Sequence, residues 1–167
     1  MNSNESAVIV LIDKLTDSIV LTQRSAHLRN HPGQVCFPGG HWQIGDTDFS
    51  ATALRELHEE LGIEARRIRL IRKLTLAHTV TGTIIHPWLA TILSLHPYTP
   101  NPLEVADVFA VPMKDVLTRS NYKDVAIEQN GVQITSLQFI ASKHLVWGAT
   151  ARIMKQLCEE EIHNHLV

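Results

Sequence analysis

Three glutamates in one short segment offer the clearest chemistry in this chain of 167 residues. The segment reads Arg55-Glu56-Leu57-His58-Glu59-Glu60-Leu61-Gly62-Ile63, so its carboxylates stand at helical offsets of 0, 3 and 4. Residues at these offsets lie on one face of an α-helix, within one turn. Like charges there repel by about a few tenths of a kcal/mol per pair, and a hard divalent cation reverses the sign. We therefore predict that Glu56, Glu59 and Glu60 bind Mg²⁺ or Mn²⁺.

The predicted metal also indicates a kind of substrate. Mg²⁺ in proteins typically binds a few carboxylates, several waters and the phosphate oxygens of the substrate. Taken alone, however, the glutamate pattern is more typical of an amphipathic helix with a solvated acidic face. The preceding residues decide between the two interpretations.

The rest of this helix is also visible in the sequence. Ala53, Leu54, Leu57 and Leu61 recur at helical spacing on the face opposite the glutamates and predict burial against a sheet. Thr47 or Asp48 is suited to cap the first turn, and Gly62 is suited to a left-handed residue after the last. We expect a helix from about residue 48 to residue 61.

A glycine pair lies fifteen positions before Arg55, in Phe37-Pro38-Gly39-Gly40. Two glycines after a proline predict a tight turn, and they permit positive φ angles and a close approach of the backbone to a ligand. Neither the P-loop pattern nor the dinucleotide fingerprint is present in the sequence. The pair is informative through its spacing to the acidic helix, and we predict that Gly39 and Gly40 contact the substrate.

These residues resemble two signatures of one superfamily. Gly40, Asp46 and the segment 55–63 resemble the Nudix box of the pyrophosphohydrolases, although eight residues rather than seven separate Asp46 from Arg55. Residues 20–40 resemble the additional signature of the coenzyme A pyrophosphatase branch, L-L-T-x-R-[SA]-x3-R-x3-G-x3-F-P-G-G, with Val20 replacing the first leucine. The extra residue leaves Asp46 out of the predicted metal set. The resemblance extends loosely over nearly the whole chain.

The resemblance implies an α/β fold, an α/β/α sandwich with a mixed β-sheet. It also implies that Arg55 orients a neighbouring glutamate rather than binding substrate. The general base is either a glutamate of the box, Glu56 or Glu59, or a remote one, for which Glu104 before a predicted strand is the best candidate. Arg24 and Arg29 offer planar donors for the phosphates of the substrate.

The leading functional hypothesis is metal-dependent hydrolysis of coenzyme A or its thioesters to 3′,5′-ADP and a 4′-phosphopantetheine species. One alternative is a Nudix enzyme that acts on ADP-ribose, a dinucleotide or a nucleoside triphosphate. A more remote alternative is a non-catalytic domain that only binds a nucleotide, which the three retained carboxylates disfavour.

Composition indicates a single globular domain over residues 1–167, with 44% hydrophobic and 19% charged residues. A net charge of −2 indicates no basic surface for nucleic acid, and the apolar runs are too short to span a membrane. The start of the chain lacks the pattern of a signal peptide, so we expect a cytoplasmic protein. Cys36 and Cys158 are expected as thiols rather than as a disulfide or zinc site. The sequence leaves open whether the protein is a monomer or a homodimer.

The remaining pattern predicts seven strands and two further helices. The strands are expected near residues 7–13, 18–23, 67–77, 83–94 and 105–111, with a hairpin of 125–128 and 132–139 around Asn130-Gly131. A short helix is expected at 113–117 and a final amphipathic helix at about 142–161, with Leu145, Ala149, Ile153 and Leu157 on its apolar stripe.

Overall fold

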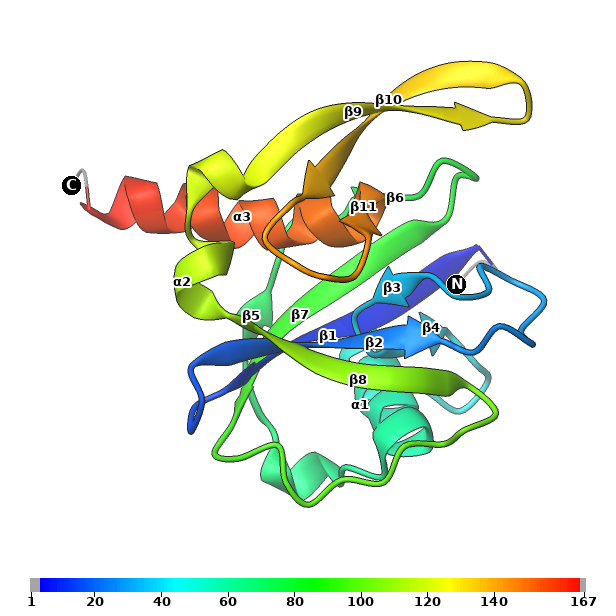
Figure 1. The fold of residues 1–167 in the computed structure, drawn as a ribbon. Coiled ribbons are helices and arrows are strands. Elements are labelled where there is room, and N and C mark those ends of the chain that lie inside the picture. The colour runs from blue at the N-terminus through cyan, green and yellow to red at the C-terminus, as the bar shows by residue number, and fades with distance from the viewer. Residues whose placement is uncertain (1–3, 166–167) are drawn as a thin grey trace.

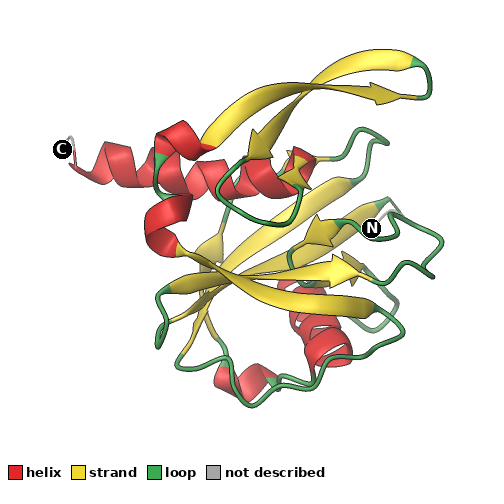
Figure 2. Cartoon of the chain, in the orientation of Figure 1, coloured by secondary structure: helices red, strands yellow, loops and turns green. Residues whose placement is uncertain are grey.

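The structure is a computed structural model that describes residues 4–165, apart from the side chains of Gln129 and of residues 161–165. Its main feature is a mixed sheet with helices on both faces (Figures 1 and 2). The sheet contains β1 (Glu5–Asp13), β2 (Ser18–Arg24), β3 (Val35–Cys36), β4 (Gly39–His41), β5 (Arg69–Lys73), β6 (Ala77–His78), β7 (Ile84–Ile92) and β8 (Val105–Pro112). The predicted α/β fold with a mixed sheet is confirmed.

The centre of the sheet is the parallel pair β1 and β7, in register from Glu5 opposite Ile84 to Asp13 opposite Ile92. The other pairings in this sheet are antiparallel. β1 is apolar on both faces because it is covered from both sides. Ala7, Ile9 and Leu11 pack on one face, whereas Val10 belongs to the core on the other.

Helix α1 (Phe49–Leu61) covers the first of these faces and carries the glutamates. Its residues Ala53, Leu57 and Leu61 face the sheet and are fully buried, as the periodicity predicted. Asp48 caps the first turn by accepting a hydrogen bond from the Ala51 amide at 2.9 Å, and Gly62 closes the last turn with a φ of 66°. Both predicted ends of the helix are confirmed.

Helix α3 (Gly148–His165) lies on the opposite face, between the main sheet and a second sheet (Figure 1). This second sheet contains β9 (Tyr122–Gln129), β10 (Val132–Phe139) and β11 (Val146–Trp147). The hairpin predicted at Asn130-Gly131 is confirmed, because both residues have the positive φ angles that a type I′ turn requires. Two short elements, α2 (Met113–Val116) and the 3₁₀ helix η2 (Arg119–Asn121), connect β8 to β9.

Two predicted boundaries are wrong. The last helix begins at Gly148 rather than near residue 142, because Val146 and Trp147 pair with β10 and Gly148 has a φ of 67°. Leu145 is consequently 63% exposed and does not belong to the apolar stripe. The single strand predicted at 67–77 is divided into the 3₁₀ helix η1 (Ala65–Arg67), β5 and β6. Within the described residues, no helix is both long and apolar enough to cross a bilayer.

Candidate active site

Three carboxylates from two distant segments meet beside α1. Glu56 and Glu60 stand one turn apart on the helix, and Glu104 immediately precedes β8. Each contributes an oxygen to a group whose members all lie within 4.8 Å of one another. Glu56 and Glu60 are only 8% and 4% exposed. The structure thus brings two of the predicted metal ligands together with the remote glutamate predicted as a base.

Glu59 does not join this group. Its side chain is 43% exposed, and its Oε2 accepts a hydrogen bond from Arg55 Nη1 at 3.1 Å. The helical rotation explains the difference, because Glu60 is displaced by about 40° from Glu56, whereas Glu59 and Glu60 are about 100° apart. Only part of the predicted set of Glu56, Glu59 and Glu60 is therefore assembled at one point.

The electrostatics of the carboxylate group are unfavourable as long as it carries no cation. Burial, followed by the charge of Glu56, raises the pKa of Glu60 to about 8. Burial also raises the pKa of Glu56. Three carboxylates confined in this way are an all-oxygen donor set, which suits Mg²⁺ or Mn²⁺. The residues present fit a hard divalent cation.

Arg55 holds Glu56, one member of this group, through a hydrogen bond. Its Nη1 donates to Glu56 Oε1 at 2.8 Å, while its Nε and Nη2 donate to the two oxygens of Asp46 at 2.9 and 3.0 Å. Asp46 also accepts hydrogen bonds from the Gln43 amide and from the Thr52 hydroxyl. The bonds from Arg55 are the main reason that the pKa of Asp46 is held down at about 2. Asp46 thus orients Arg55, and its oxygens are already occupied.

The glycine pair approaches the glutamates more closely than any other residue type would permit. A Cβ atom on Gly40 would lie 2.4 Å from Glu56 Cδ, and one on Gly39 would lie 2.2 Å from the carbonyl oxygen of Ala7. The prediction of a tight turn is wrong, because both glycines lie in β4 and pair with β1. Neither glycine adopts the positive φ that its residue type permits. They are needed here for space alone.

The Gly39 amide has a partner within the protein. It donates to Glu60 Oε2 at 3.2 Å, so it orients a carboxylate instead of being free for a phosphate. Gly39 and Gly40 nevertheless line a pocket, which joins the glycine pair to the region between β3, the loop after β6 and the start of α3. The two predicted glycines thus lie between the carboxylate group and the pocket.

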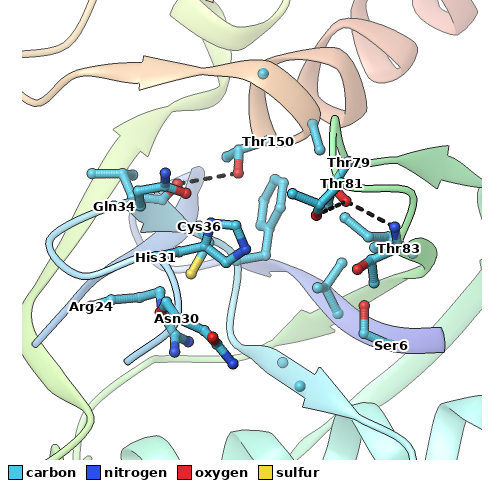
Figure 3. A pocket seen from close by; sticks show the side chains of 18 of the residues that line it. Ser6, Arg24, Asn30, His31, Gln34, Cys36, Thr79, Thr81, Thr83 and Thr150 are labelled. Atoms are coloured by element: carbon cyan, nitrogen blue, oxygen red, sulfur yellow. Dashed lines mark hydrogen bonds between the residues drawn. The ribbon is translucent and has the colours of Figure 1, made fainter. Parts of the chain in front are cut away.

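The pocket has a volume of about 250 Å³ and two polar walls (Figure 3). Arg24, Asn30, His31 and Gln34 belong to one wall. The opposite wall is formed by Thr79, Val80, Thr81 and Thr83, and the side chains of Thr79 and Thr81 face the pocket in Figure 3. Arg24 is held by a hydrogen bond of 3.1 Å from its Nε to the Asn30 carbonyl oxygen, and its charge acts on Glu60 and Cys36. The predicted substrate residue Arg24 is therefore beside the carboxylates.

The sequence prediction and the pocket differ at several residues. Arg29 is exposed and does not belong to the lining of the pocket. Conversely, the threonines of residues 79–83 and Arg152 of α3 line it without having been predicted as site residues. No motif pointed to Arg152.

Comparison with known proteins agrees with this geometry. A family model described as NUDIX domain matches residues 3–129. An uncharacterized Nudix hydrolase NudL from Photorhabdus laumondii is 36% identical over 163 residues, covering 95% of this chain and 86% of that protein. A protein of the same description from Enterobacter sp. (strain 638) is 34% identical, covering 94% of this chain and 82% of its own length.

Solved structures share the fold at low sequence identity. A MutT/nudix family protein from Enterococcus faecalis has a TM-score of 0.62 at 16% identity, over 98% of this chain and 63% of its own. The Nudix hydrolase RenU from M. smegmatis has a TM-score of 0.60 at 14% identity, over 98% of this chain and 90% of its own. At these identities the likeness concerns the fold alone.

Proposed function

We propose that this chain, which belongs to the Nudix hydrolase family, hydrolyses the diphosphate bond of coenzyme A or acyl-coenzyme A with Mg²⁺ or Mn²⁺. The products are 3′,5′-ADP and 4′-phosphopantetheine or its acyl form. The family supports the type of reaction, and the substrate is the new part of the proposal.

One observation carries the choice of substrate. The segment that resembles the coenzyme A pyrophosphatase signature ends at Gly39 and Gly40, which contact the box glutamates Glu60 and Glu56 respectively. The same segment supplies Arg24 and Cys36 to the pocket. Residues 20–40, which resemble the coenzyme A pyrophosphatase signature, therefore contribute to the wall of a pocket that opens beside the carboxylates.

Glu56, Glu60 and Glu104 would hold the cation, and Glu59 remains a predicted ligand at the exposed rim of the group. A divalent cation at such a site neutralises the charge of a diphosphate and lowers the pKa of a bound water. Arg55 keeps Glu56 in place, and the Gly39 amide does the same for Glu60. Arg24 lies where it can donate to the diphosphate. The candidates for the general base that accepts a proton from the attacking water are still Glu56, Glu59 and Glu104.

The proposal is tested by identifying products. The purified protein is incubated with coenzyme A and Mg²⁺ or Mn²⁺. The products are then separated by chromatography and identified by mass spectrometry. We expect 3′,5′-ADP and 4′-phosphopantetheine in equal amounts from the wild type and none from Glu60→Gln. Intact coenzyme A after incubation with the wild type, under conditions where another nucleoside diphosphate derivative is cleaved, would contradict the proposal.

A further inference from the structure

Arg152 is a cation in the pocket wall that forms no ion pair with any described residue. It lies one turn into α3 and lines the pocket together with the threonine-rich loop after β6. Its Nη2 donates to the carbonyl oxygen of His78 at 2.5 Å, which holds the side chain next to Thr79. Among the described side chains, no carboxylate forms an ion pair with it. The loop and the helix are thus connected through a guanidinium whose charge is not neutralised.

A partly buried cation without an opposite charge beside it costs free energy. Burial lowers the pKa of Arg152, and within the described part of the chain no neighbouring charge opposes this effect. Arg55 provides the contrast, because the hydrogen bonds that it donates to Asp46 and Glu56 raise its pKa. A partly buried charge in a protein is usually paired with an opposite charge. For Arg152 an anionic ligand in the pocket could provide that opposite charge.

The groups around Arg152 are suited to an anion. The hydroxyls of Thr79 and Thr81 lie 3.0 Å apart, and because that contact uses a single hydrogen, one hydroxyl hydrogen of the pair is left to donate. Both threonines face the pocket (Figure 3). Guanidinium and hydroxyl donors together are typical of sites that bind phosphate.

Arg152 and Arg24 occupy different parts of the pocket. Arg24 belongs to the wall of residues 24–34, and its charge acts on Glu60. Arg152 is attached to the opposite wall through the carbonyl of His78, directly before Thr79. A ligand that fills the pocket therefore meets one arginine beside the carboxylates and a second one away from them. Coenzyme A has a matching pair of anionic groups, its diphosphate and the phosphomonoester on its ribose.

We propose that Arg152, assisted by the hydroxyls of Thr79 and Thr81, binds the 3′-phosphate of the substrate and so distinguishes coenzyme A from nucleotides that lack this group. This inference rests on the proposed function. It assigns the diphosphate to the Arg24 side of the pocket and the phosphomonoester to the Arg152 side.

The test compares coenzyme A with 3′-dephospho-coenzyme A as substrates of the wild type, Arg152→Met and Arg152→Lys. We expect the wild type to prefer coenzyme A. Arg152→Met should lower kcat/KM for coenzyme A by about 10- to 100-fold, the usual effect of losing a hydrogen bond to a charged group, mainly through KM. Turnover of the dephospho form should be nearly unchanged, and Arg152→Lys should restore part of the preference. Equal losses on both substrates, or no loss on either, would overturn the assignment.

Arg72→Met is the matched control. Arg72 also connects the main sheet to α3, through an ion pair with Glu160, but it lies outside the pocket. The control should keep the wild-type preference for coenzyme A, which separates recognition of the phosphate from a loosened helix. A loss of preference in Arg72→Met equal to that in Arg152→Met would assign the effect to helix packing and overturn the proposal.

A binding measurement separates this inference from the proposed function. Calorimetry compares 3′,5′-ADP with 5′-AMP on the wild type and Arg152→Met. Tighter binding of 3′,5′-ADP that disappears in Arg152→Met supports the subsite, even if coenzyme A is not hydrolysed and the proposed function fails. Equal affinities on the wild type would reject the subsite, even if coenzyme A is hydrolysed.

Discussion

Replacing Glu60 with glutamine should stabilise the metal-free protein while it abolishes activity. Glu60 is 4% exposed, and the pKa of its carboxyl is raised from 4.5 to about 8 by burial and by Glu56. When folding raises the pKa of a carboxyl, that group stabilises the folded state fully at pH values below its pKa in the unfolded state. This stabilisation is lost as the pH rises toward the pKa in the folded state. Between these values the free energy of unfolding falls by about 1.4 kcal/mol per pH unit. At pH 7 the accumulated loss is about 3 kcal/mol, which Glu60→Gln avoids.

The assay is urea unfolding of the wild type and Glu60→Gln in EDTA, at pH 5 and pH 7. We expect nearly equal stability at pH 5 and an advantage for Glu60→Gln at pH 7. Mg²⁺ at about 100 times its dissociation constant should stabilise the wild type by about 2.7 kcal/mol and the variant by less. Glu64→Gln, at an exposed carboxylate outside the site, is the control and should differ from wild type by less than about 0.5 kcal/mol. A Glu60→Gln variant no more stable than wild type at pH 7 in EDTA would refute this reasoning.

Four further variants test the neighbouring contacts. Gly40→Ala should lower kcat/KM by about 100-fold, because its Cβ would displace a carboxylate by an ångström or more; wild-type turnover would contradict the close contact. Asp46→Asn should cost about 1.5–3 kcal/mol of unfolding free energy, since it removes the charge that holds Arg55. Because the pKa of Asp46 is lowered from 3.8 to about 2, urea unfolding should show a constant cost from pH 5 to pH 8 that shrinks only as the pH falls below about 4. A cost that vanishes at neutral pH would count against the ion pair. Glu104→Gln should raise the Mg²⁺ concentration for half-maximal activity by about tenfold or more, and Glu59→Gln by less; metal titrations with the reverse order would favour the sequence-based set.

The elements that the sequence predicted best are those with local signals. Asp48, Gly62 and the apolar spacing of α1 define that helix within a few residues, and Asn130-Gly131 defines the hairpin. The start of α3 was missed because β11 is only two residues long and exists through its pairing with β10. A pairing between distant segments leaves no periodic signal in so short a strand.

The site shows the same distinction between local and distant information. The spacing of Glu56 and Glu60 was sufficient to predict that they act together, whereas the replacement of Glu59 by Glu104 in the carboxylate group depends on how β8 is placed beside α1. Arg152 is a further case. In the sequence it is one basic residue of an amphipathic helix, and only the loop after β6 turns its position into part of a pocket. The positions of Glu104 and Arg152 in the site both depend on contacts between segments that are far apart in the chain.

The most direct test of the proposed function is a comparison of kcat/KM for coenzyme A, ADP-ribose, a dinucleoside polyphosphate and a nucleoside triphosphate at saturating Mg²⁺. The account predicts the highest value for coenzyme A or an acyl-coenzyme A, by a factor of about ten or more, which corresponds to about 1.4 kcal/mol of transition-state discrimination. A higher kcat/KM for ADP-ribose than for coenzyme A would contradict it.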